Sequence, residues 1–257
     1  MSSVLLKIEE DVAFITLNRP EKLNAFNRSM ALELQRILDA CHTHAVRCIC
    51  LTGAGKGFCA GQDLAELTGP EAPSMAEILS VHYNPIIRKI RHLPIPVLAA
   101  VNGVAAGAGA NLALCCDIVI AAEEAVFVQA FSKVGLIPDS GGTYFLPRLI
   151  GWQRASALMM LGEKIGAQDA VKMGMIYACF SGGEFAHAAK QMALQLAKYP
   201  TKALALTKHA LNHSLNNTFE EQLELEDRFQ QEAALTYDYR EGISAFLEKR
   251  QPQFKGD

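Results

Sequence analysis

Asp139 is the residue whose surroundings most favour acid–base chemistry. It lies in residues 135–142 (GLIPDSGG), where apolar side chains precede it and two glycines follow. An apolar pocket raises the pKa of a carboxyl group, so that the group can accept a proton and later return it. A structural interpretation also fits, because Asp139 or Ser140 could be a turn residue or the N-cap of a following helix. The sequence leaves both interpretations open.

Two segments of small residues could supply the groups that stabilise a developing negative charge. Residues 58–64 (FCAGQDL) and 103–109 (GVAAGAG) each follow a predicted strand, and the second leads into a predicted helix. Small side chains leave backbone N–H groups uncovered, and two such groups aimed at one point form an oxyanion hole. The same small residues could instead serve tight packing alone.

Several other catalytic signatures are absent from the sequence. Residues 53–57 lack the Ser or Thr that follows the lysine of a Walker loop, and residues 107–109 do not continue to the third glycine of a dinucleotide-binding fingerprint. No Gly-x-Ser-x-Gly motif of a serine hydrolase is present. Histidines and cysteines lack the spacing of a zinc site, so we expect no metal.

Hydrophobic periodicity predicts the elements that must position these residues. Apolar runs predict strands at residues 4–8, 12–17, 48–52, 97–101, 118–120 and 176–180. Helical spacing predicts helices at about residues 27–41, 75–91, near Asn111, and at 151–162, 167–173, 183–198, 201–213, 218–234 and 238–249. Strands that alternate with helices indicate an α/β fold with largely parallel strands, followed by a helical C-terminal part.

Composition excludes several classes of protein. The 257 residues include 24 basic and 27 acidic side chains, a net charge of −3, which lacks the basic excess of nucleic-acid-binding proteins. Seven scattered cysteines indicate buried thiols in a reducing compartment, and the first residues show no targeting signal. Residues 96–116 are uncharged, but their glycines and asparagines favour a buried strand-turn-helix over a membrane span. We expect a cytoplasmic protein with neither nucleic acid nor membrane as partner.

A series of short motifs occurs in order along nearly the whole chain. They are residues 17–20 (LNRP), 23–25 (LNA), 57–64 (GFCAGQDL), 100–103 (AVNG), 116–118 (CDI), 135–138 (GLIP), 141–143 (GGT) and 241–250. This series resembles the crotonase, or enoyl-CoA hydratase/isomerase, superfamily. The resemblance implies an α/β crotonase (ClpP-like) spiral of ββα units over residues 1–195 and a helical C-terminal trimerisation region over residues 196–257. It also implies a homotrimer or a dimer of trimers.

The resemblance assigns roles to individual residues. In this family two backbone N–H groups bind the thioester oxygen of an acyl-CoA substrate, and the matching positions here are Gln62 and Ala108. Asp139 stands where isomerase-type members carry their acid–base residue. The implied CoA-binding residues are Arg19, Lys22, Ala60, Asp63, Phe246 and Lys249, of which the last two would cover the CoA of a neighbouring subunit. Lys249 could equally be a solvated residue at a helix end. Coenzyme A is here part of the substrate, so we expect no separate cofactor.

Departures from the family pattern narrow the expected reaction. Hydratases of the family carry two glutamates, and the matching positions here are Asn111 and Phe131, which we assign to the substrate pocket. Neither side chain can deprotonate water, whereas one carboxyl suffices to move a proton between carbons. We therefore expect an acyl-CoA isomerase. Residues 102–110, 130–133 and 238–242 resemble members that convert the ring epoxide of an aromatic acyl-CoA into a seven-membered oxepin thioester, and a 3-enoyl to 2-enoyl shift would follow the same chemistry.

Three alternatives remain open. The chain could be an aliphatic 3-enoyl-CoA isomerase or a hydratase-like enzyme. It could be a dehalogenase or hydrolase in which Asp139 acts as a nucleophile. It could also be a non-catalytic protein of the same fold that binds CoA esters.

Overall fold

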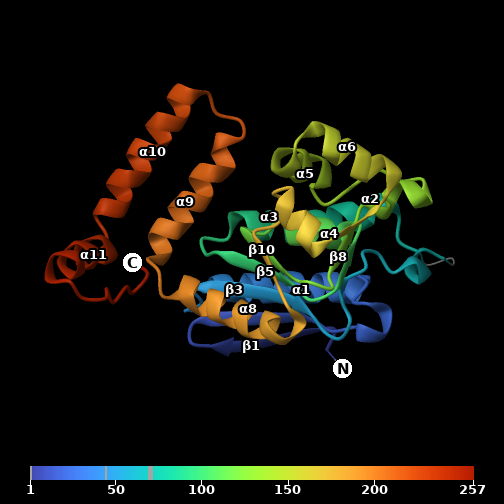
Figure 1. Cartoon of the computed structure of the whole chain (residues 1–257), viewed down its shortest axis with the longest axis horizontal. Coiled ribbons are helices and arrows are strands. Elements are labelled where there is room, and N and C mark those ends of the chain that lie inside the picture. Colours follow the sequence, from blue (N-terminus) through green and yellow to red (C-terminus); the bar gives the residue numbers. More distant parts are fainter. Residues whose placement is uncertain (1, 44, 69–71) are drawn as a thin grey trace.

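The computed structural model describes residues 2–43, 45–68 and 72–257 and shows an α/β fold with two sheets (Figure 1). Within these residues the larger sheet contains β1 (Val4–Glu9), β2 (Val12–Leu17), β3 (Cys48–Gly53), β5 (Val97–Val101), β7 (Ile118–Ala122) and β10 (Ala178–Phe180), in that order. β1 and β2 form an antiparallel hairpin, and each later strand runs parallel to its neighbour. The predicted α/β fold with largely parallel strands is confirmed.

The smaller sheet brings together the loops that follow its strands. It contains β4 (Gly57–Cys59), β6 (Val104–Ala106), β8 (Val126–Val128) and β9 (Lys164–Gly166), in that order, and only β9 among them is antiparallel to its neighbour. β4, β6 and β8 each follow a strand of the larger sheet after a short turn and precede helical residues, which is the ββα repeat that the family resemblance implies. Because β4 and β6 are parallel neighbours, their carboxyl ends lie at the same edge of the sheet.

Helices and short helical turns connect and cover the strands. The helices of the core are α1 (Arg28–Thr43), α2 (Met75–Glu77), α3 (Asn84–His92), α4 (Ala108–Leu114), α5 (Gly142–Ile150), α6 (Trp152–Leu161), α7 (Ala167–Lys172) and α8 (Gly182–Ala197). The 3₁₀ helices are η1 (Pro20–Lys22), η2 (Leu64–Leu67) and η4 (Ala130–Val134), and η3 (Ile78–Tyr83) is a π-helix.

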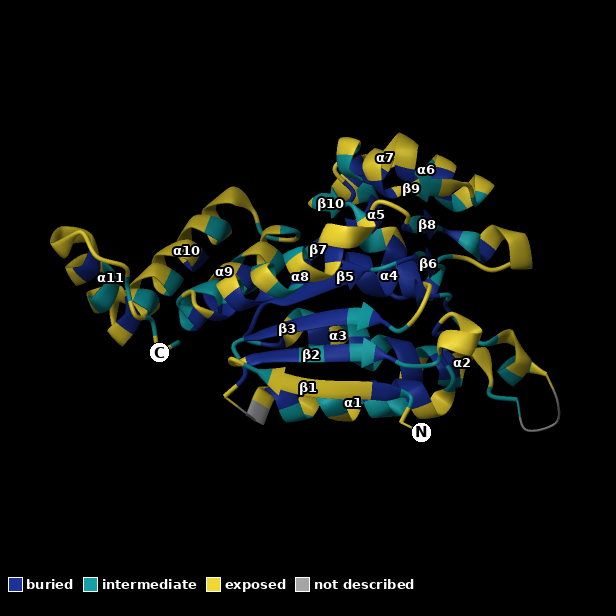
Figure 2. Cartoon of the chain, turned by 60° about the horizontal axis from the view of Figure 1, so that its bottom comes forward, coloured by how far each residue is buried: buried dark blue, intermediate teal, exposed yellow. Residues whose placement is uncertain are grey.

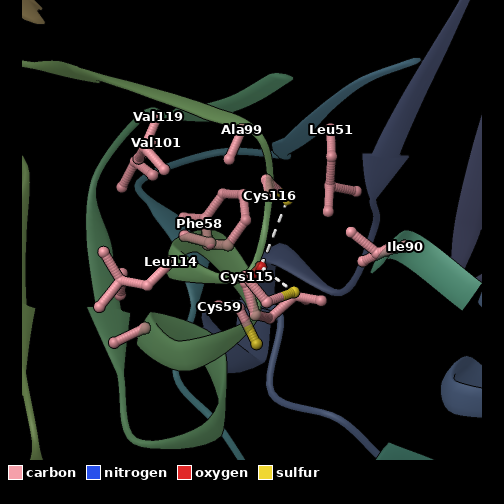
Figure 3. Packing of buried hydrophobic residues seen from close by; sticks show 14 of the residues in the cluster. Leu51, Phe58, Cys59, Ile90, Ala99, Val101, Leu114, Cys115, Cys116 and Val119 are labelled. Atoms are coloured by element: carbon pink, nitrogen blue, oxygen red, sulfur yellow. Dashed lines mark hydrogen bonds between the residues drawn. The ribbon is translucent and has the colours of Figure 1, made fainter. Parts of the chain in front are cut away.

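The central strands of the larger sheet, β3 and β5, are buried on both faces, as their alternating side chains show. Leu51 and Ala99 point into the main core, which also contains Phe58 of β4 (Figure 3). Cys50 and Leu98 point to the opposite face, where α8 packs. Figure 2 shows β2 and β3 largely buried, whereas the edge strand β1 is mostly exposed. Burial on both faces accounts for the continuous apolar runs in the sequence.

Three further helices project from the core as a C-terminal arm (Figure 1). They are α9 (Thr201–Ser214), α10 (Phe219–Ala234) and α11 (Tyr237–Glu248). The buried side chain of Lys208 joins α9 to the core: its Nζ lies 2.8 Å from Asp117 Oδ2 and donates to Ile95 O at 3.1 Å. The boundary expected between residues 195 and 196 falls in the last turn of α8, which still packs on the sheet.

Three features differ from the sequence prediction. The single helix expected at residues 75–91 is divided into α2, η3 and α3. Periodicity did not predict the strands of the smaller sheet, because strands of three residues are too short to show alternation. The bounds of α5 were not predicted, although a helix after Asp139 was one interpretation, because this helix begins at a glycine and contains Pro147.

Residues 96–116 form β5, β6 and α4, which confirms the strand-turn-helix interpretation of this uncharged stretch. In the part of the chain that the structure describes, no helix is both long and apolar enough to cross a membrane.

Candidate active site

Two glycine-dependent loops follow β4 and β6 and approach each other closely. Gly61, in the first loop, has a φ of +87°, and a Cβ at this position would lie 2.9 Å from Ala106 O. Gly107, in the second loop, has a φ of +52°. Gly109 packs directly against β4, since a Cβ there would lie 2.2 Å from Cys59 O. Side chains at these positions would strain the backbone or push the loops apart, so the small residues permit close packing and also expose backbone.

The backbone N–H groups of Gln62 and Ala108 are available to bind a ligand. Neither has a hydrogen-bond partner among the described residues. Both residues line one pocket of about 140 Å³. The loops adjoin here, because a Cβ on Gly61 would lie 3.5 Å from Ala108 N. Two free backbone donors at one pocket can stabilise an oxyanion.

Asp139 lines the same pocket, together with apolar residues that include Phe131, Val134 and Leu136. Burial raises the pKa of its half-buried carboxyl, and the Ser140 hydroxyl, which donates to Oδ1 at 2.9 Å, opposes part of that rise. Among the described residues that line the pocket, Asp139 is the one carboxylate. Such a group can accept a proton from a neighbouring carbon atom and return it.

Asp139 also belongs to a tight turn, which is one of the two structural roles that the sequence suggested for it. Its main-chain oxygen accepts a hydrogen bond from Gly142 N at 2.8 Å. Ser140 and Gly141 both have positive φ, of +52° and +78°. The N-cap of α5 is Gly141, however, and neither Asp139 nor Ser140 occupies that position. The turn presents the carboxyl to the pocket.

The two positions where hydratases of the family carry glutamates differ in their surroundings. Phe131 lines the pocket, as expected, and its ring lies beside Gly107. Asn111 does not belong to the pocket lining, contrary to the expectation, because its side chain is fully buried behind it. The Asn111 amide donates through Nδ2 to Asp139 O at 2.8 Å, and its Oδ1 accepts from Gln129 Nε2 at 2.7 Å.

Tyr83 is a pocket residue that sequence reasoning missed. Its hydroxyl donates to Gln62 Oε1 at 2.9 Å, and its ring meets Phe26 edge to face with centroids 5.7 Å apart. Burial raises the pKa of the Tyr83 hydroxyl well above its usual range. Tyr83 ends the π-helix η3, a distortion that the helical spacing of residues 75–91 does not reveal. Because Gln62 Nε2 also donates to Glu66 at 2.8 Å, both ends of the Gln62 amide are held.

Four of the expected CoA-binding residues lie close together beside the pocket. Arg19 pairs with Asp63 at 2.8 Å, and this guanidinium lowers the pKa of the Asp63 carboxyl. Lys22 follows in η1 and is exposed. Ala60 lines the pocket, and its N–H donates to Leu23 O at 3.0 Å, which ties this segment to the loop after β4.

The other two expected CoA-binding residues lie elsewhere. Phe246 is 83% exposed on α11, and Lys249 follows at the end of that helix. Figures 1 and 2 both show α11 on the C-terminal arm, at the opposite end of the molecule from α2, whose Met75 lines the pocket. Within one chain these residues cannot join Arg19 and Lys22. Their contact with a neighbouring subunit's CoA stays a prediction.

Comparison with known proteins connects this geometry to a family. Residues 7–257 match the family model described as enoyl-CoA hydratase/isomerase. The chain is 50% identical to 1,2-epoxyphenylacetyl-CoA isomerase of Escherichia coli, over 100% of this chain and 99% of that protein. It is 36% identical to 2,3-dehydroadipyl-CoA hydratase of the same organism, over the full length of both. A crystal structure of enoyl-CoA hydratase from Bacillus anthracis superposes with a TM-score of 0.92 at 34% identity, covering 99% of this chain and 100% of that one.

Proposed function

Because the chain belongs to the enoyl-CoA hydratase/isomerase family, a family of enzymes, we propose that it isomerises 2-(1,2-epoxy-1,2-dihydrophenyl)acetyl-CoA to oxepin-CoA. One observation carries the proposal. A single carboxyl, Asp139, shares an apolar pocket with the N–H groups of Gln62 and Ala108, which have no partner among the described residues. The choice of substrate is supported by the relative that is 50% identical and named for this reaction.

In the proposed mechanism the thioester oxygen accepts hydrogen bonds from Gln62 N–H and Ala108 N–H. The Asp139 carboxylate removes a proton from the carbon next to the thioester, and the two donors stabilise the resulting enolate. Each donor is worth about 3–4 kcal/mol in comparable sites. The enolate electrons then form a double bond to the ring carbon that bears the side chain, and the bond between the two carbons that carry the epoxide oxygen breaks, which expands the ring to seven members. The electrons of the broken bond pass along the ring double bonds to a ring carbon, which takes the proton back from Asp139.

The proposed reaction gains and loses no atoms, so it requires neither a redox partner nor a separate cofactor. The same two steps would shift a 3-enoyl double bond to the 2-position, which makes aliphatic 3-enoyl-CoA the second candidate substrate. Efficient hydration is not expected, because holding and deprotonating water requires a second carboxylate. Phe131 and Asn111 occupy the positions where that pair stands in hydratases of the family.

The Asp139→Asn variant tests the proposal, because it keeps the shape of the side chain and removes the base. We expect kcat for both substrates to fall about 100- to 10,000-fold. Asp169→Asn is a matched control, since Asp169 is exposed on α7 and contacts Lys172 rather than the pocket. Near-wild-type isomerisation by Asp139→Asn would exclude the mechanism. Competition between the ring-epoxide thioester and an aliphatic 3-enoyl-CoA on one preparation would rank the two substrates.

The remaining alternatives predict different results. A dehalogenase or hydrolase with Asp139 as nucleophile would form a covalent adduct, which mass spectrometry detects. A non-catalytic CoA-ester-binding protein would bind the thioester but exchange none of its protons in heavy water. An isomerase of the proposed kind exchanges protons and forms no adduct.

We further infer that the enzyme is a cytoplasmic homotrimer or dimer of trimers. Large apolar side chains are exposed on the C-terminal arm, among them Leu235, Phe246 and Leu247. A subunit interface would cover them, since burying apolar surface drives association. All seven cysteines are free thiols, which suits a reducing compartment. Light scattering of the purified protein distinguishes three subunits from six.

A further inference from the structure

Asn111 is a fully buried amide whose two hydrogen bonds orient it without ambiguity. Asp139 O is a carbonyl oxygen and can only accept, so Asn111 must turn Nδ2 toward it, at 2.8 Å. The other end of the amide, Oδ1, then accepts from Gln129 Nε2 at 2.7 Å. Gln129 is itself buried, and its Oε1 has no partner among the described residues. This buried pair of amides has one evident target, the main chain of Asp139.

The position of Asn111 in α4 links the two parts of the proposed active site. Ala108, whose N–H is one oxyanion donor, begins this helix, and Asn111 lies three residues later on the same face. One rigid helical turn therefore carries both the oxyanion donor and the side chain that holds the Asp139 loop.

The Asp139 loop benefits from this support because its backbone is strained, although Gly142 N also donates to Asp139 O at 2.8 Å. Ser140 and Gly141 both have positive φ, which is costly for serine. Close packing reinforces the contact, since a Cβ at Gly142 would lie 2.3 Å from Asn111 Nδ2. The loop and the amide are therefore in direct contact, with no room for an intervening water.

We propose that Asn111 is a positioning residue, which touches no substrate and holds Asp139 at the correct distance from the Gln62 and Ala108 N–H groups. The inference rests on the proposed function, in which Asp139 is the base. Position 111 then has a role different from that of the glutamate that hydratases of the family carry there. A displacement of the base of about 1 Å typically costs about 100-fold in rate, whereas substrate binding depends on other contacts.

The test is proton exchange from phenylacetyl-CoA in heavy water, measured by mass spectrometry. This thioester carries the proton that Asp139 removes and has no epoxide, so the assay reports the base and the oxyanion hole alone. The Asn111→Asp variant keeps the acceptor for Gln129 and replaces the donor to Asp139 O by an oxygen. We expect its exchange rate to fall about 10- to 100-fold. Its dissociation constant for phenylacetyl-CoA, from calorimetry, should stay within twofold of wild type.

Asn212→Asp is the matched control. Asn212 also donates through Nδ2 to a main-chain oxygen, that of Arg91 at 2.9 Å, and accepts through Oδ1 from a neighbouring side chain, but it belongs to α9 and contacts α3. The Asn212→Asp variant should exchange protons at the wild-type rate. If Asn111→Asp does not fold, Gln129→Glu is the second variant, because a carboxylate beside Oδ1 would turn the Asn111 amide around. It should produce the same loss of exchange with unchanged binding.

The outcomes separate this inference from the proposed function. If Asp139→Asn exchanges protons at the wild-type rate, the proposed function fails. If Asp139→Asn is inactive but Asn111→Asp exchanges within twofold of wild type, the positioning role is overturned. A loss of binding as large as the loss of exchange would overturn it too, because Asn111 would then contribute to the pocket itself.

Discussion

Replacing Gly61 with alanine tests the oxyanion hole directly, because this glycine belongs to the first donor loop and packs against the second. At a φ of +87° an L-residue is strained by about 1–3 kcal/mol. The new Cβ would also lie 2.9 Å from Ala106 O and 3.5 Å from Ala108 N, so the loops must separate. Loss of one aligned oxyanion donor lowers kcat about 100- to 1,000-fold. We therefore expect Gly61→Ala to reduce kcat at least about 100-fold and the free energy of unfolding by about 1–3 kcal/mol.

The assay combines steady-state kinetics on a 3-enoyl-CoA, whose conjugated product absorbs in the ultraviolet, with urea unfolding. Gly151→Ala is the control for backbone strain alone. Its φ is +80°, no atom lies within 4 Å of a Cβ built there, and it is outside the pocket lining. It should lose stability and keep its kcat. If Gly61→Ala keeps kcat within threefold of wild type, the two loops do not form the oxyanion hole.

Two further predictions concern pH and the C-terminal arm. Burial raises the pKa of Asp139, so kcat/KM should rise as pH increases through that raised pKa. The stability that Asp139 contributes is complete below its unfolded pKa of 3.8 and is lost as pH rises through its pKa in the folded protein. Asp139→Asn should therefore raise Tm at about pH 8 and have no such effect near about pH 3, and an equal shift at both would contradict the burial argument. Lys208→Met should cost about 3 kcal/mol in urea unfolding, near the low end for a broken buried pair because Arg91 stays 3.3 Å from Asp117. A loss below about 1 kcal/mol would mean that this pair does not hold α9 to the core.

The long elements of the fold were predictable because their periodicity is strong. β3 and β5 are buried on both faces, and α8, α9 and α10 show sustained apolar spacing, so residue patterns alone locate them. The strands of the smaller sheet could not be predicted from periodicity, because each spans three residues. Their pairing depends on neighbours 22 to 47 residues away along the chain, such as Val104 with Val126 and Gly57 with Val104, which no local pattern encodes.

The main residues of the candidate site could be predicted from the sequence, but the contacts that hold them in place could not. Asp139, Gln62 and Ala108 were identified from local composition and family motifs, and they line one pocket. Tyr83 was missed because π-helical geometry changes which face of a helix a residue occupies. Asn111 was expected in the pocket because a glutamate at that position faces substrate in hydratases of the family. A shorter amide reaches the Asp139 carbonyl instead.

The packing around Asn111 indicates why a base at 139 and a glutamate at 111 are hard to combine. A carboxylate here would place an acceptor oxygen against Asp139 O, which already accepts from Gly142 N, and no proton would lie between the two oxygens. A longer side chain would also collide with Gly142, whose Cα already leaves no space for a Cβ beside the amide. The glutamate would have to turn away into the pocket and would leave the Asp139 loop without its buried donor. Asparagine in place of glutamate at position 111 thus removes one catalytic group of a hydratase and at the same time supports the base at position 139. On this argument, restoring glutamate at position 111 alone should weaken isomerisation without producing an efficient hydratase.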